Sequence, residues 1–114
     1  MKRFVYVITD RNRTSLHVGM SSDLLKTINF YKEMPNLFFD SASQLSRLIY
    51  FEELRTEEVA LHRFNLICKF TRAQKEKLIR DVNPDWLDLA IGLSYEEMML
   101  QDERMEPVKI GKAA

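Results

Sequence analysis

Two side chains that can exchange protons stand in neighbouring apolar runs near the start of the chain. Tyr6 lies in RFVYVIT (3–9) and His17 lies in SLHVGM (15–20), on either side of a polar loop. Because an unperturbed imidazole titrates near neutral pH, His17 could act as a general base. No carboxylate partner for it is identifiable from the sequence, so a hydrogen-bonded strand histidine is the favoured interpretation.

Basic side chains on a later stretch could contact the backbone of a nucleic acid. Glu76 and Asp81 interrupt this basic run, which favours a mixed, solvated helix face. Since the chain carries 17 basic and 17 acidic residues, its formal charge of zero lowers the expectation of a nucleic-acid binder. Any binding to DNA is expected to be weak and steeply salt-dependent. The basic residues concerned are Arg72, Lys75, Lys77 and Arg80.

The sequence offers little for metal or disulfide chemistry. With two histidines and one cysteine, no zinc site is readable and no internal disulfide can form. Cys68 is expected to be a small buried hydrophobe. No apolar run approaches the roughly 20 residues of a membrane span, and the apolar N-terminal run is too short for a signal-peptide core. A soluble, cytoplasmic protein without a membrane partner is the expectation.

The elements that must position these side chains follow from apolar periodicity. Strands are predicted at 3–9, 15–20 and 47–53 because these runs are rich in β-branched and aromatic residues. Helices are predicted from about 24 to 34 and 56 to 69, then from a capping box at Thr71. Short helices are expected at 83–90, with Pro84 first and Trp86 as a core anchor, and from Ser94 to about 104. The order predicts an α/β (α+β) fold: a small, three-stranded, mostly antiparallel sheet flanked by helices.

Several strings in this order resemble the small single-domain branch of the GIY-YIG endonuclease superfamily. The strand FVYVI resembles the family's first motif and places its tyrosine at Tyr6, and His17-Val18-Gly19 stands where the family has Tyr-x-Gly. RLIYFEE resembles the third strand, and TRAQKEKLI followed by NPDWLDL resembles the C-terminal helices. The resemblance covers about residues 3–90 and implies a GIY-YIG-like domain at 1–90. Residues 91–114 are then a helical extension with a frayed tail.

The resemblance implies an endonuclease chemistry with four parts. Two motif tyrosines lie together, and one of them helps to activate or orient the attacking water. An arginine on the first helix neutralises the scissile phosphate, and a glutamate on the next long helix binds a divalent metal, typically magnesium. A phosphodiester transition state spreads negative charge over its oxygens, so a fixed cation and a hard metal are the main stabilisers.

The chain departs from this pattern at three positions. Tyr6 and Gly19 are kept, but His17 replaces the second tyrosine, Thr27 stands at the arginine position and Phe64 at the glutamate position. Phenylalanine cannot bind a metal, and no metal ligand or cofactor is assigned. Phe64 is placed on one apolar helical stripe with Ala60, Ile67 and Cys68, which favours a core role.

Two basic residues flank the missing positions. Lys26 precedes Thr27 and could reach a phosphate, but a helix turns about 100° per residue, so a solvated surface lysine is favoured. Arg63 precedes Phe64 and either lines the implied cleft or pairs with Glu57 or Glu58.

The leading hypothesis is a catalytically degenerate GIY-YIG-like domain that works as a binding or adaptor module and contacts nucleic acid. The alternative is an active magnesium-dependent DNA endonuclease with a rearranged site, in which Glu52, Glu53 or Glu58 supplies the metal ligand. The loop at 36–46 has no Lys or Arg. Phe38 and Phe39 there favour a protein contact or a core flap over a phosphate track.

Overall fold

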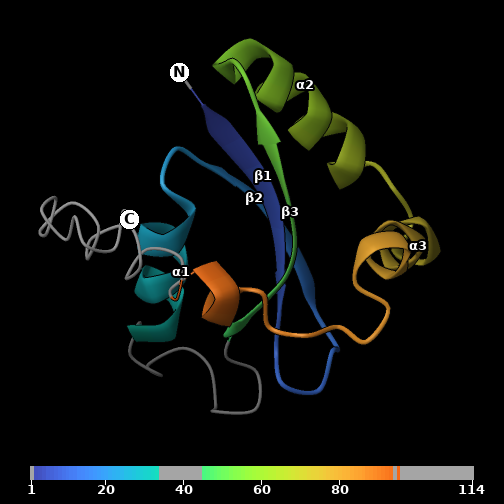
Figure 1. The fold of residues 1–114 in the computed structure, drawn as a ribbon. Coiled ribbons are helices and arrows are strands. Elements are labelled where there is room, and N and C mark those ends of the chain that lie inside the picture. The colour runs from blue at the N-terminus through green and yellow to red at the C-terminus, as the bar shows by residue number, and fades with distance from the viewer. Residues whose placement is uncertain (1, 34–44, 94, 96–114) are drawn as a thin grey trace, which may run out of the picture.

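A computed structural model describes residues 2–33, 45–93 and 95 of the chain. The strands follow the predicted positions to within one or two residues, and the three main helices likewise follow the apolar periodicity. Their order along the chain is strand, strand, helix, strand, helix, helix (Figure 1). The elements are β1 (Arg3–Thr9), β2 (Leu16–Ser21), α1 (Leu24–Glu33), β3 (Arg47–Leu54), α2 (Glu57–Cys68) and α3 (Arg72–Val82).

The strands form an antiparallel sheet in the order β2-β1-β3. β1 is therefore central, and its residues from Val5 to Thr9 are all buried. The pairing of β1 with β3 shifts register between Val7 and Ile8, as at a β-bulge. The predicted α+β architecture with a small three-stranded sheet is confirmed.

Helices cover both faces of the sheet (Figure 1). On one face, Tyr6 and Ile8 pack with Leu24 and Ile28 of α1. On the other face, α2 and α3 cover the sheet, and Val5 packs against α2. Because side chains of a strand alternate between faces, the continuous apolar run of β1 supplies both cores.

Threonines cap the starts of α2 and α3, and the cap at Thr71 is the predicted one. Thr56 Oγ1 accepts a hydrogen bond from the Val59 N–H at 3.1 Å. Thr71 forms a full capping box, in which its hydroxyl accepts from the Gln74 N–H and the Gln74 side chain accepts from the Thr71 N–H. Both caps satisfy N–H groups that the first helical turn leaves without partners.

The predicted short helix at 83–90 is wrong. Pro84 lies in a turn, and helical residues begin only at Ala90. The Asn83 side chain holds the turn, because its carbonyl accepts from the Leu87 N–H at 3.0 Å and its amide donates to Leu87 O at 3.0 Å. The amide also donates to Ile49 O of β3 at 2.9 Å. Trp86 is buried, as predicted, and it adopts a positive φ of 53°.

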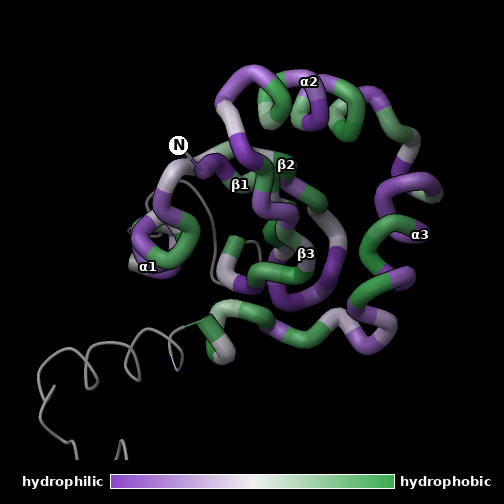
Figure 2. Tube along the Cα trace, turned by 45° about the horizontal axis from the view of Figure 1, so that its top comes forward, coloured by the Kyte–Doolittle hydropathy of each residue, from purple (hydrophilic) through white to green (hydrophobic). Residues whose placement is uncertain are grey.

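Cys68 is exposed, which contradicts the predicted burial. Ala60 and Ile67 mark the buried side of α2, and Cys68 follows Ile67 by one residue, or about 100° around the helix. The outer side of α2 mixes hydrophobic and hydrophilic residues (Figure 2). Val59, Leu61 and Leu66 are exposed there.

The C-terminal helix begins earlier than the predicted cap at Ser94, because residues 90–93 and 95 are helical. Leu93 packs against the core that contains Tyr6, just beyond the expected domain boundary at 90. The further course of this helix, the tail, and the predicted contact through Phe38 and Phe39 lie outside the described residues. None of the helices in the described part is long and apolar enough to cross a membrane.

Candidate functional site

Tyr6 and His17 occupy the same face of the sheet. Tyr6 pairs with Gly19 and Ile8 pairs with His17 across β1 and β2. Paired residues of an antiparallel ladder point to one side, and so do residues two apart along a strand. The predicted juxtaposition of these two side chains on one face is therefore observed.

A third residue, Tyr31 of α1, joins them. The Tyr31 hydroxyl lies 3.1 Å from His17 Nε2, and their ring centroids are 5.7 Å apart. Tyr31 also lies close enough to Tyr6 to raise the pKa of the Tyr6 hydroxyl. We call these three residues the tyrosine–histidine trio. The sequence indicated Tyr31 only as an apolar helix position; its spacing of three residues from Ile28 placed it on the sheet side.

Burial governs the protonation of Tyr6 and His17. Desolvation, reinforced by the contact with Tyr31, raises the pKa of Tyr6 far above its ordinary value, so its phenol stays protonated at neutral pH. Partial burial of the ring lowers the pKa of His17. At neutral pH Tyr6 is therefore a phenol and His17 a neutral imidazole, and both are suited to hydrogen bonding.

Gly19 is required by the close approach of Tyr6. A Cβ atom at position 19 would lie 2.3 Å from both Cζ and Oη of Tyr6. The ring of Tyr6 thus occupies the space that any other side chain would fill. This explains the glycine between His17 and α1 without invoking a phosphate or any other ligand.

Thr27 is tied to the end of β2. Its Oγ1 lies 2.6 Å from the hydroxyl oxygen of Ser21. A neutral pair of hydroxyls thus stands where the resemblance implies a phosphate-neutralising arginine. The Ser21 hydroxyl also accepts from the Asp23 N–H at 3.0 Å, which fixes the chain at the entry to α1.

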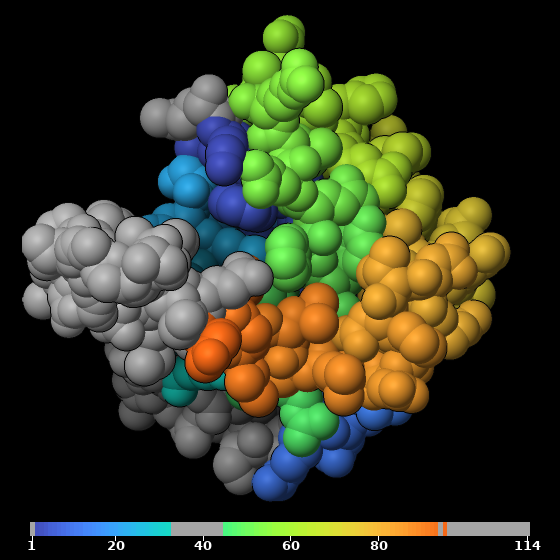
Figure 3. Space-filling view, in the orientation of Figure 1, coloured from blue at the N-terminus to red at the C-terminus, as the bar shows by residue number. Residues whose placement is uncertain are grey.

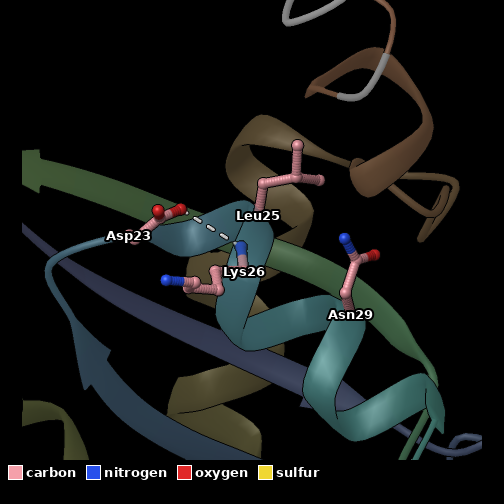
Figure 4. Close-up of a pocket in the computed structure, with 4 residues that line it drawn as sticks. All are labelled: Asp23, Leu25, Lys26 and Asn29. Atoms are coloured by element: carbon pink, nitrogen blue, oxygen red, sulfur yellow. Dashed lines mark hydrogen bonds between the residues drawn. The ribbon is translucent and has the colours of Figure 1, made fainter.

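Lys26 lies on the outer side of α1, as predicted for a surface lysine, and it is exposed. An open hollow of about 230 Å³ there is lined by Asp23, Leu25, Lys26 and Asn29 (Figure 4). Asp23 caps the helix, because its Oδ1 accepts from the Lys26 N–H at 3.1 Å. The hollow is a feature of the first turns of α1, and the trio lies on the opposite, sheet-facing side.

Phe64 packs beside the core cluster of Val5, Ala60 and Ile67, between α2 and the sheet. Val5 points to the opposite face of β1 from Tyr6. The core role predicted for Phe64 is observed, with Ala60 and Ile67 as neighbours and without Cys68. A side chain at this position contributes to the α2 core.

Glu52 and Arg63 form a second polar cluster, on the α2 side of the sheet. The Arg63 guanidinium donates from Nε and Nη2 to the Glu52 carboxylate over 2.7–2.9 Å, and the Tyr50 hydroxyl donates to the same carboxylate. The predicted pairing of Arg63 with Glu57 or Glu58 is therefore wrong. Arg63 lies on the side of the sheet opposite the trio, which excludes it from a cleft at Tyr6.

Mutual contacts shift the titration of this cluster. Burial alone would raise the pKa of Glu52, but hydrogen bonds from Arg63 and Tyr50 outweigh it and hold that pKa below its usual value. Burial and the Glu52 carboxylate raise the pKa of Tyr50 to about 12. Glu52 is thus an ionised carboxylate that is already fully engaged.

The side chains do not fit the magnesium site that the resemblance implies. Magnesium requires oxygen ligands, usually carboxylates, and Phe64 offers none. Glu58 is exposed on α2. Glu53 shares the face of Tyr6, but it pairs with Phe4, whereas His17 pairs with Ile8. Phe4 and Ile8 are four residues, or about 13 Å, apart along β1, so Glu53 lies far from His17. Within the described residues, no group of three or more His, Cys, Asp or Glu side chains could hold a metal.

Two further predicted nucleic-acid ligands make contacts within the molecule. Arg72 donates to Thr14 O at 2.7 Å and pairs with Glu76 at 2.8 Å. Lys75 is half-buried and shares the inner side of α3 with Ile79, four residues later.

The arrangement of sheet and helices also occurs in a solved structure. The fold is similar to that of a UPF0213 protein from Bacillus halodurans, determined by NMR in solution. The two structures align with a TM-score of 0.51 and 17% sequence identity, over 77% of this chain and 93% of the other. At this identity the likeness concerns the fold alone. No protein-family model matches the chain, and no curated protein matches it.

Proposed function

We propose that this chain is a GIY-YIG-like domain that has lost metal-dependent phosphodiester cleavage and works as a nucleic-acid-binding module. The observation that carries the proposal is Thr27, whose hydroxyl lies 2.6 Å from that of Ser21 where the resemblance implies a phosphate-neutralising arginine. Phe64 adds to it, because its ring packs with Val5 on the face of the sheet opposite Tyr6 and supplies no carboxylate at the implied glutamate position. The similar fold of the UPF0213 protein supports the nuclease-like ancestry of the architecture.

The hydrogen bonds of the remaining residues support the loss of cleavage. Thr27 is engaged with Ser21 at the implied arginine position, and Glu52 is engaged with Arg63. Removing one preorganised electrostatic partner typically costs about 3–4 kcal/mol of transition-state stabilisation. The loss of a metal ligand and a phosphate cation together is expected to lower the rate of cleavage by several powers of ten. The two losses are not simply summed, because effects within one site are not strictly additive.

The test is a nuclease assay on branched and nicked DNA with magnesium and with manganese, beside a binding titration on the same substrates. We expect binding at low salt and no cleavage with either metal. Metal-dependent cleavage that Tyr6→Phe or His17→Gln abolishes would establish the alternative, an active endonuclease with a rearranged site. Absence of binding at low salt would refute the binding module.

A further inference from the structure

Arginines from three separate segments lie toward the end of the sheet where β1 turns into β2. Arg11 and Arg13 lie in the turn itself, and Arg47 begins β3 opposite Thr9. Arg72 opens α3 against the same turn, and Arg80 follows two helical turns later. Figure 3 shows the turn in blue at the lower edge, beside the green start of β3 and below the orange segment that follows α3.

Carbonyl groups hold two of these guanidiniums in place. Arg72 donates to Arg13 O at 2.5 Å and to Thr14 O at 2.7 Å. Arg13 donates to Asp85 O at 3.4 Å, and its guanidinium lies 5.3 Å from the centroid of the Trp86 ring. Carbonyls and an aromatic face orient a guanidinium without cancelling its charge, so these contacts build a positioned positive surface.

The carboxylates nearby do not neutralise this surface. Glu76 is shared by two arginines, at 2.8 Å from Arg72 and 3.7 Å from Arg80. Asp10 is buried, and its carboxylate accepts hydrogen bonds from Thr14 and Ser15. Among the residues that the structure describes, Asp85 is the third carboxylate here, so five guanidiniums stand against three acids in a chain whose formal charge is zero.

On the neighbouring side of α3, by comparison, positive and negative charges are balanced. Lys77 pairs with Asp81 at 3.4 Å, one helical turn apart on a different stripe from Arg72, Glu76 and Arg80. The surplus of positive charge is therefore confined to the flank of α3 that adjoins the turn. We call Arg11, Arg13, Arg47, Arg72 and Arg80 the arginine row.

We propose that the arginine row is the surface that binds the phosphate backbone of duplex nucleic acid. The inference rests on the proposed function and specifies where that binding occurs. Planar guanidiniums match phosphate oxygens in paired hydrogen bonds. Arg72 and Arg80 are eight residues apart on a helix, or about 12 Å, and a duplex carries about one phosphate charge for every 1.7 Å of its axis.

The row binds without reading sequence and favours duplex over single strands. Trp86 has only 8% of its surface exposed, so it offers no platform on which an unpaired base could stack. Contacts to phosphates alone position a duplex but carry no base information. Binding at the row is therefore independent of sequence and falls steeply with salt.

The experiment compares two double variants that remove the same charge. In Arg11→Gln/Arg80→Gln, Arg11 is exposed, and the one ion pair of Arg80 within the described ranges is the 3.7 Å contact to Glu76. The control Lys2→Gln/Arg55→Gln removes two exposed cations at the opposite end of the sheet. Each protein is titrated into a fluorescently labelled DNA duplex at several salt concentrations, with unlabelled polyglutamate as a competitor.

We expect the row variant to bind several-fold more weakly and to lose about two units of the log–log salt slope, while the control keeps the slope of the wild type. Equal losses in both variants would overturn the assignment of the row and leave the proposed function intact. If no variant and no wild-type protein binds duplex, the proposed function fails together with the row. If polyglutamate displaces the duplex when both are present at equal charge concentration, the row is not specific for phosphates, and an acidic protein becomes the expected partner in place of nucleic acid.

Discussion

The guanidinium of Arg13 lies over the ring of Trp86, and these two are the non-glycine residues with positive φ in the described structure, at 58° and 53°. A left-handed backbone is unfavourable for residues with a Cβ atom and persists only where the surroundings enforce it. The contact therefore joins two strained turns, one between β1 and β2 and one after α3.

Trp86→Ala is expected to destabilise the fold by about 3–5 kcal/mol, because it empties a large buried site beside Val7 and Ile79. Leu87→Ala is the matched control, since Leu87 is 62% exposed, and it should change the unfolding free energy by less than about 0.5 kcal/mol. Chemical denaturation of both variants measures the difference. Similar losses in the two would contradict the anchoring role of Trp86.

Gly19→Ala is expected to destabilise the fold by about 1–3 kcal/mol, because the new methyl group collides with the Tyr6 ring. Gly92→Ala meets no atom within 4 Å and lies in a helix, so it should be neutral or stabilising by up to about 1 kcal/mol. Thermal unfolding of the pair compares them directly. The close packing of Tyr6 on Gly19 would be disproved by an unchanged melting temperature in Gly19→Ala.

Tyr31→Phe removes the hydroxyl that contacts His17 while keeping the ring. The expected loss is about 1 kcal/mol of unfolding free energy, the usual net contribution of a hydrogen bond. A double-mutant cycle with His17→Gln isolates the Tyr31–His17 contact, which should couple by more than about 0.5 kcal/mol. Strict additivity of the two substitutions would show that the contact contributes nothing.

The pKa of His17 is lowered in the folded protein, whereas the imidazole of the unfolded chain keeps its ordinary pKa of about 6.5. As the pH falls through this value, the unfolded chain therefore takes up a proton before the folded protein does. The contribution of His17 to stability is then complete above that value and decreases as the pH falls through it. His17→Gln should flatten the pH dependence of the unfolding free energy between about pH 7 and pH 5. An NMR titration of the imidazole gives the pKa itself, and a value above 6.5 would reverse the sign.

Arg63→Gln breaks the ion pair with Glu52, whose side chain is only 17% exposed. Breaking a fully buried pair costs about 3–5 kcal/mol, and we expect roughly half of that because the Arg63 side chain is 31% exposed. Lys77→Gln is the control, since its pair with Asp81 is exposed at both ends, and it should cost less than about 0.5 kcal/mol. Equal losses of unfolding free energy in the two variants, measured by urea denaturation, would show that the Arg63–Glu52 pair contributes no more than an exposed pair.

The sheet could be predicted because its signals are local. The residues of β1 are apolar on both sides, and the central strand is buried on both faces. Thr71 and Gln74 likewise carry their capping pattern within four residues. Each of these features depends on the backbone within one strand or one helical turn.

The errors arose where a distant segment decides the structure. Pro84 is compatible with a helix start, but Asn83 instead bonds to Ile49, 34 residues away. Arg63 has two acids on its own helix, yet it pairs with Glu52 across the interface with β3. The role of Tyr31 in the trio depends on α1 packing over β2, which no periodicity along α1 can indicate.

The segment after α3 covers backbone groups at the outer edge of β3, and this contact protects the strand from pairing with another chain. The Leu48 N–H donates to Asp88 Oδ1 at 3.2 Å, and Leu48 O accepts from the Leu89 N–H at 2.7 Å. An outer strand whose backbone groups stay open is a template for pairing with another chain, and aggregation can start there. Asp88 and Leu89 occupy the backbone groups of Leu48 within the molecule, so a chain that ended before them would leave this part of the β3 edge open to pairing with another strand.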